Sequence, residues 1–432
     1  MTPQGQFTVV APLVSGREAD LRRLLDSMNA QPGLADPRNE VLPFGDFEQL
    51  HFARLVLLDD ALQSDLQALG QPRRPLPTVL ALMGECDGAA CDCLAALVQR
   101  AHAGLCRVFA HCEGFDADAD VLAWLLAHDR PVQASYVNWV GRTVLQIREE
   151  SALQALLSAR VPRATPASGS EAQRVREALR EIVQTELKQG RLMLTPPAPT
   201  PLAWRLVQLL NLLAVPLVGL LLFPFLLLVS PLLAWRLRSL ENSDPEICPR
   251  PQAQALRTLQ VLEDRDVTNQ YTAIGPVKPG LFRRWLLSGL LVLIDYASRH
   301  FFTHGFLARV QTIHFARWVF LDDKARVLFT SNYDGSHQGY MDDFINKVAW
   351  GLNLAFSNGV GWPRTRWLVL GGARIEQRFK PWQRRHQVPT QVWYKAYLGL
   401  SLVDLSRNQR IREGLERPSM SDAQALAWLK LL

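Results

Sequence analysis

Two ten-residue segments of this chain are nearly identical, and they constrain its fold more than any other feature. Residues 51–60 read HFARLVLLDD and residues 314–323 read HFARWVFLDD, so eight of the ten positions match. Each copy is followed by an acidic-Gly corner, Asp87-Gly88 in the first and Asp334-Gly335 in the second. A repeat this close, in the same relative place, indicates a duplicated domain.

The order of apolar runs predicts the same fold for both halves, which we place at residues 1–160 and 266–418. Strands are expected at 6–14, 51–60, 77–84 and 132–147 in the first half, and at 269–277, 306–323, 327–332 and 367–379 in the second. Helices are expected at 16–31, 89–111, 171–189, 281–303, 336–356, 391–405 and 422–432. Each half then reads β-α-β-β-α-β, the order of a ferredoxin-like split unit. The predicted class is α+β, with the two units pairing into a barrel-like sandwich.

The segment between the halves is the most apolar stretch of the chain. Residues 206–233 carry no charge, and a helix needs about 20 apolar residues to cross a bilayer core. The tetrad Ala-Trp-Arg-Leu stands at both ends, so the expected interfacial anchors are Trp204, Arg205, Trp235 and Arg236. We predict a membrane element at 202–240, a linker and charged helix at 161–201, and a C-terminal helix at 419–432.

Two topologies fit this element. A single tilted span places the halves on opposite sides of the membrane, whereas a re-entrant hairpin bent between Pro216 and Pro224 keeps them on one side. The basic flanks are symmetric, so the positive-inside rule does not choose a direction. The duplication favours one side, because units of this kind pair through their sheets. Helix 281–303 is apolar nearly all round and fits either the membrane surface or a protein core.

The composition points to a membrane rather than to nucleic acid. The net charge is +6, but no zinc-finger, RNA-binding or basic-helix pattern accompanies it. No signal peptide is recognised at the start of the sequence, so the soluble halves are expected in the cytoplasm, at a bacterial-type inner membrane, with reduced thiols. Five cysteines between residues 86 and 112 lack metal-ligand spacing. The sequence leaves the oligomeric state open.

The repeat also supplies the candidate site residues. By strand alternation, His314 and Ala316 share one face of the strand and Arg317 lies on the other. A pocket between the halves would be flanked either by His51 and His314 or by Arg54 and Arg317. Paired arginines suit an anionic or propionate-bearing ligand, and a histidine can bind iron or transfer protons. The alternative is that these groups, with the turn residues Asp87 and Asp334, only serve the fold.

Two ferredoxin-like units in one chain, with an Asp-Gly corner and a basic interior, resemble the dimeric α/β-barrel superfamily. Gly84-Glu85-Cys86-Asp87-Gly88 is similar to the G-x-x-D-G motif of the dye-decolourising peroxidases, and Ser331 replaces the first glycine in the second copy. The resemblance implies a haem cofactor, with Asp87 or Asp334 assisting peroxide cleavage beside Arg54 or Arg317. His314, His51 and His337 are the candidate iron ligands. The second half also resembles unannotated bacterial membrane-associated proteins.

Two functions follow as hypotheses. In the first, a membrane-associated protein holds a cofactor or an apolar small molecule in a pocket between its halves, as a haem peroxidase-like oxidoreductase would. In the second, the protein is a non-catalytic membrane-associated binding or scaffold protein, and the repeat only builds the fold. The motifs of serine hydrolases, P-loop proteins and Rossmann enzymes are absent from the sequence.

Overall fold

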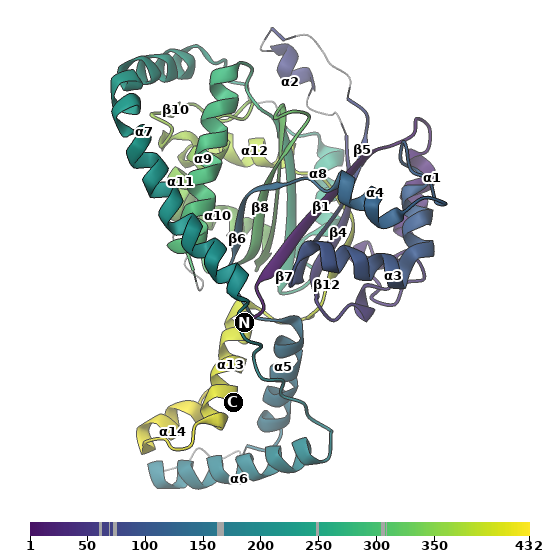
Figure 1. The fold of residues 1–432 in the computed structure, drawn as a ribbon, viewed down its shortest axis with the longest axis vertical. Helices are drawn as coiled ribbons and strands as arrows, with labels where there is room; N and C mark the ends of the chain where they lie inside the picture. Colours follow the sequence, from purple (N-terminus) through teal and green to yellow (C-terminus); the bar gives the residue numbers. More distant parts are fainter. Residues whose placement is uncertain are drawn as a thin grey trace.

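The computed structural model describes residues 1–59, 63–68, 70–71, 76–161, 168–247, 250–303, 307 and 309–432. Their fold is α+β, as predicted, with two sheets at the centre and helices on the outside (Figure 1). Residues 162–167 of the predicted linker and Asp60 of the first repeat lie outside the described residues.

The two sheets contain all the long strands. In spatial order the first sheet consists of β1 (Gln4–Pro12), β5 (Val79–Asp87), β4 (Leu50–Leu58), β12 (Thr390–Lys395), β3 (Gly33–Ala35) and β2 (Asn29–Gln31). The second consists of β6 (Val132–Val137), β8 (Ile313–Leu321), β9 (Arg326–Asp334) and β7 (Thr268–Pro276). Strands β10 (Thr365–Arg366) and β11 (Leu370–Gly371) form a separate short hairpin. The repeat segments are strands β4 and β8.

Each half gives one strand to the sheet of the other half. Strand β6 belongs to the first half of the sequence but pairs with β8, and β12 belongs to the second half but pairs with β4. The strand orders β1-β5-β4-β12 and β7-β9-β8-β6 are therefore equivalent. This exchange makes the two halves one body, and the described strands form two sheets rather than a closed barrel.

The molecule is layered as helix, sheet, sheet and helix (Figure 1). The first sheet is covered by α1 (Glu18–Asp26), α3 (Ala90–Phe109) and α4 (Val121–His128). The second is covered by α9 (Leu281–His300), α10 (His337–Lys347), α11 (Ala349–Phe356) and α12 (Glu376–His386). Between the sheets lies an aliphatic core in which Val56 and Leu58 of one repeat strand meet Val319 and Leu321 of the other.

A smaller bundle extends from one end of the sandwich (Figure 1). It consists of α5 (Val144–Ser158), α6 (Gly169–Lys188), α13 (Leu402–Glu416) and α14 (Asp422–Leu429). The remaining short elements are η1 (Phe44–Asp46), α2 (Gln63–Ala68), α8 (Ala253–Leu262) and η2 (Gly372–Arg374).

The last strand of each half was predicted incorrectly. Residues 132–147 form only the short strand β6, because Thr143 and Gln146 make a capping box that starts helix α5. Residues 367–379 form mainly η2 and the start of α12, and Trp367 and Leu368 have positive φ values of 57° and 62°, which no regular strand contains. The actual strand β12 lies in a segment predicted as helix, where aromatic and β-branched residues favour a strand.

The apolar segment forms one helix, α7 (Leu202–Ser243) of 42 residues, and its most apolar window is 0% buried. Figure 1 shows α7 running along one side of the molecule beside α9, which it contacts, and turning over at its upper end. Pro216, Pro224 and Pro231 lie inside the helix, and prolines are the usual cause of such changes of direction.

Candidate functional site

A β-bulge in each repeat strand decides where its histidine points. Leu50 pairs with Cys86 and Phe52 with Glu85, so His51 is the extra residue. Ile313 and Phe315 pair with consecutive residues of β9 in the same way, which leaves His314 extra. A bulge breaks strict alternation. The prediction that His314 shares a face with Ala316 is therefore wrong, and both histidines lie between the sheets together with the arginines.

Arg317 reaches from one sheet into the other. Its guanidinium donates to the carbonyl oxygens of Phe7 and Gly84, to Thr8 Oγ1 at 2.9 Å and to the carboxylate of Glu85. The side chain is 0% exposed. Two strands of the opposite sheet, β1 and β5, are thus held by one side chain.

Arg54 makes the equivalent contacts in the opposite direction. It donates to the carbonyl oxygen of Tyr271 and to Thr272 Oγ1, both at 3.0 Å, to the Ser331 carbonyl at 3.3 Å and to Asn332 Oδ1. Burial lowers the pKa of Arg54 to about 10, so the guanidinium remains charged at neutral pH. The terminal N–H groups of both arginines all donate to acceptors within the protein. This arrangement favours a role in joining the sheets over the binding of an anionic ligand.

The histidines form buried pairs with the Asp-Gly aspartates. His51 Nε2 lies 3.0 Å from Asp87 Oδ1, and His314 Nε2 lies 2.7 Å from Asp334 Oδ1. The second oxygen of each aspartate accepts the first helical N–H of the bundle, from Val144 of α5 at 2.9 Å and from Leu402 of α13 at 2.7 Å. A carboxylate is stabilised at a helix N-terminus. Each aspartate therefore joins a repeat strand to a bundle helix, instead of capping the helix that follows its own corner.

Tyr397 lies between the two pairs. Its hydroxyl is 3.2 Å from His51 Nδ1, and its ring centroid is 6.2 Å from that of His314. In the tautomer that carries its proton on Nε2, His51 donates to Asp87 and accepts from the Tyr397 hydroxyl at Nδ1. Burial raises the pKa of Tyr397 well above its ordinary value. Tyr397 is thus hydrogen-bonded to His51, whereas its contact with His314 is between the rings.

The space at this centre is small. The cavity between His51, His314, Tyr397 and Arg142 has a volume of about 20 Å³, enough for about one water molecule. A haem does not fit there, and the Nε2 atom of each histidine already has an aspartate partner. The residues therefore do not fit the cofactor that the peroxidase resemblance implies.

The G-x-x-D-G pattern has a packing reason in this protein. A Cβ atom at Gly84 would lie 2.3 Å from Cζ of the buried Phe7, so a larger residue would displace the ring that packs over this position. Gly88 turns the chain with a φ of +84°. The glycines serve the fold, and Asp87 serves the connection to α5.

His337 lies apart from the other candidate histidines. It starts α10, its ring centroid lies 6.0 Å from that of Tyr271 in a tilted arrangement, and neither ring nitrogen has a hydrogen-bond partner among the described residues. Burial lowers the pKa of His337 to about 4, so the ring is neutral at physiological pH. The structure does not bring it together with His51 and His314.

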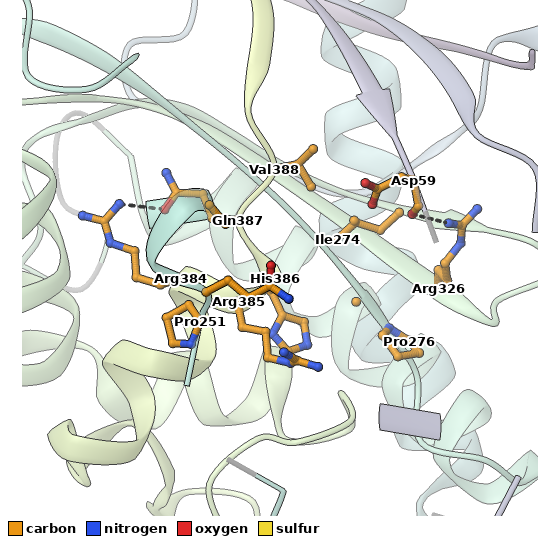
Figure 2. Close-up of a pocket in the computed structure, with 13 residues that line it drawn as sticks. Asp59, Pro251, Ile274, Pro276, Arg326, Arg384, Arg385, His386, Gln387 and Val388 are labelled. Carbon is orange, nitrogen blue, oxygen red and sulfur yellow. Dashed lines mark hydrogen bonds between the residues drawn. The ribbon is translucent and has the colours of Figure 1, made fainter. Parts of the chain in front are cut away.

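A separate pocket of about 240 Å³ collects part of the basic run that the sequence contains after residue 373. Figure 2 shows His386 at its centre, with Arg384 on one side and Arg326 beside Asp59 on the other. The charges are compensated, because Arg384 pairs with Glu263, Arg385 with Asp65 at 2.6 Å, and Arg326 with Asp322. The pocket has a mixed polar and apolar lining whose charges are balanced, so it offers little electrostatic attraction to an anion.

The predicted anchor residues lie at the two ends of α7. Trp235 is 64% exposed, Arg205 and Arg236 are exposed, and Trp204 is half-buried. Among the described residues, none covers the large aromatic ring of Trp235. Its exposure fits the interfacial role that the sequence predicts.

The comparisons with known proteins add no relative: no protein-family model matches the chain, and no curated protein matches it.

Proposed function

We propose that the protein is a membrane-associated binding protein whose two halves lie on one side of the bilayer, with the continuous helix α7 embedded in the membrane surface along its length. The observation that carries the proposal is the exposed apolar helix. Between residues 217 and 228, large side chains on every side of α7 are exposed, from 44% for Leu226 to 79% for Leu228. A helix that is apolar all round needs an apolar surrounding.

Both ends of α7 are tied to the same folded body. Near its start, Tyr296 Oη donates to the Leu212 carbonyl at 3.2 Å, and His300 Nε2 lies 2.9 Å from Asn211 Oδ1. Near its end, the buried Glu241 accepts from Thr365 Oγ1 at 3.0 Å and from the N–H groups of Trp367 and Leu368. Attachment of both ends to one body supports placing both halves on one side of the membrane, although α7 is one helix rather than the hairpin bent between Pro216 and Pro224.

The strand exchange argues against a single span. With β6 in the second sheet and β12 in the first, the halves cannot lie on opposite faces of a membrane while the sheets remain intact. Opening both sheets would leave long unpaired edges. Of the two topologies that fit the sequence, we therefore propose the one-sided one.

Two of the three prolines in α7 are accommodated in a way that suits an apolar medium. Proline has no N–H, so Pro216 and Pro231 leave the carbonyls four residues earlier without their helical partner. Instead, the Tyr296 hydroxyl donates to the Leu212 carbonyl, and the Ser230 hydroxyl donates to the Leu227 carbonyl at 2.8 Å. Such replacement bonds are how prolines are tolerated in membrane helices.

We further propose that the halves arose by duplication of one β-α-β-β-α-β unit of ferredoxin-like type, with the last strand exchanged. The equivalent contacts of Arg54 and Arg317 support this. We place the body on the cytoplasmic face of a bacterial-type inner membrane, in keeping with the free cysteines Cys86, Cys93 and Cys112. The cavity between the histidines is too small for haem, which argues against peroxidase chemistry and in favour of the non-catalytic membrane-associated role.

Vesicle flotation tests the proposal. The wild-type chain should float with liposomes of anionic composition. A Leu220→Lys, Leu221→Lys double variant should lose at least about a hundredfold in partitioning, because each lysine costs roughly 2.5 to 3.5 kcal/mol in a bilayer core. Val403→Lys is the matched control, since Val403 is 76% exposed but lies on α13.

The same vesicles test the topology. Terminal tags should both be digested by protease added outside, because the halves lie on one side. Protection of one tag alone would establish a single span, and a wild-type chain that stays in solution without detergent would refute membrane association altogether.

A further inference from the structure

The second half contains an apolar cavity that the repeat site does not use. It has a volume of about 180 Å³ and lies between α9, α11 and the outer face of β8 and β9. The residues around it include Leu293 and Ala297 of α9, Trp318 of β8, and Gly351 and Leu354 of α11. An apolar cavity of about 150 Å³ stays free of water and takes benzene or xenon, so this space suits a hydrocarbon group.

One wall of the cavity adjoins α7. Helix α9, which lines the cavity, contacts both α7 and α11, and Figure 1 shows α7 and α9 side by side. Helices α9 and α11 expose Trp285 at 68%, Leu293 at 58% and Trp350 at 41%, and Leu293 and Trp350 also line the cavity. The cavity therefore borders an exposed apolar surface next to the helix that we propose the membrane covers.

One polar group in the lining limits the chemical class of ligand that the cavity can bind. Trp318 is 7% exposed, and its indole N–H has no hydrogen-bond acceptor among the described residues. A buried donor without a partner is costly. An occupant with an oxygen acceptor near its hydrocarbon chain would supply that partner. Trp318 is also one of the two positions where the repeats differ, and Leu55 in the other copy packs into a filled core.

We propose that this cavity holds the carbonyl end and the first methylene groups of one fatty-acyl chain of a membrane phospholipid, with the carbonyl oxygen accepting the Trp318 N–H and the rest of the chain lying outside the cavity. The proposal rests on the membrane association proposed above. It gives the protein a ligand class, and it assigns the sequence difference at Trp318 to ligand binding.

Two glycines make a matched test. A Cβ atom at Gly351 meets no atom within 4 Å, and Gly351 lines the cavity. A Cβ at Gly289 also meets no atom within 4 Å, but Gly289 is an exposed residue of α9 outside the lining. Gly351→Leu therefore fills the cavity, whereas Gly289→Leu adds the same side chain elsewhere. Ala297→Leu fills the cavity from the opposite wall and replaces Gly351→Leu if that variant does not fold.

The measurement is binding of the fluorescent fatty acid cis-parinaric acid to delipidated full-length protein in detergent, with dioleoyl phosphatidylcholine as competitor. We expect saturable binding of one probe per chain, displacement by the phospholipid, and no change in Gly289→Leu. Gly351→Leu or Ala297→Leu should weaken binding at least about tenfold, since the added side chain displaces several methylene groups. Trp318→Phe should weaken it about threefold to tenfold through the lost hydrogen bond.

Three outcomes would overturn the proposal: no saturable binding by the wild type, equal binding by wild type and folded cavity-filled variants, or binding that the phospholipid does not displace. Flotation separates this failure from failure of the proposed function. A cavity-filled variant that floats like the wild type shows that membrane attachment through α7 is independent of the cavity.

Discussion

The two copies of the repeat use the same geometry with different charges. Arg317 ends on the carboxylate of Glu85, whereas Arg54 ends on the amide oxygen of Asn332. Their other acceptors are equivalent, namely two backbone carbonyls and one threonine hydroxyl. Each copy therefore uses an arginine to hold two strands of the opposite sheet, but only Arg317 makes a direct ion pair, whereas Arg54 donates to neutral acceptors. The copies differ again at the start of the following helix, where His337 stands at the position equivalent to Ala90.

The largest expected loss of stability comes from replacing the two arginines, and the two losses should differ. Arg317→Met leaves the buried Glu85 without its cation and should lower the free energy of unfolding by roughly 3 to 5 kcal/mol. Arg54→Met leaves only neutral acceptors unpaired and should cost less, on the order of 2 to 3 kcal/mol. Urea denaturation in detergent measures both. Adding Glu85→Gln to Arg317→Met should recover part of the loss, and an Arg54 variant as damaging as the Arg317 variant would contradict the comparison.

A pH titration of stability sharpens the difference at His337. Burial lowers the pKa of His337 to about 4 from an ordinary value of 6.5. The unfolded chain binds this proton more readily, so the contribution to stability is fully present above about pH 6.5 and is lost as the pH falls towards 4, by on the order of 2 to 3 kcal/mol. His337→Ala should flatten the unfolding free energy over this pH range.

The remaining slope after that substitution should come from His386, whose pKa burial also lowers to about 4. His102→Ala, at an exposed position of α3, is the control and should leave the slope unchanged. If the unfolding free energy of His337→Ala changes with pH as steeply as that of the wild type, His337 is not the source of acid sensitivity in the second copy.

The smallest effect should be the same in both copies. Asp87→Asn and Asp334→Asn each remove a charge between a histidine and a helix N-terminus, and each should cost about 1 to 2 kcal/mol. Thermal unfolding compares them with Asp26→Asn, which changes an exposed aspartate at the end of α1. A large difference between the two repeat variants would show that only one His–Asp pair holds its bundle helix.

Much of the fold could be predicted because its signals are local. The repeat strands, the helix at 281–303 and the first strand of each half all appear close to the predicted residues, since each has a clear apolar period or a turn at its boundary. The last strands failed for a local reason too. The capping box at Thr143 marks where α5 begins, and it would have ended the strand predicted at 132–147 earlier. The capping box at Ser401 marks where α13 begins, and it would have separated β12 from the helix predicted at 391–405.

The candidate site was predicted in its residues but not in its arrangement. Alternation cannot foresee a bulge, because the extra residue depends on how the neighbouring strand pairs. Tyr397, which lies between the histidines, carries no motif that would have marked it. The partners of each arginine lie more than 210 residues away in the chain, so no spacing rule connects them.

The sequence by itself determined the repeated segment, the α+β class and the apolar segment, because these depend on residue identity and period. Only the tertiary structure decided that the last strands are exchanged and that both histidines turn inward at bulges. It also decided that the arginines join the sheets and that both ends of α7 attach to one body. These features arise from contacts between segments far apart in the chain, and their free energy comes from packing and hydrogen bonds that exist only once the two halves have come together.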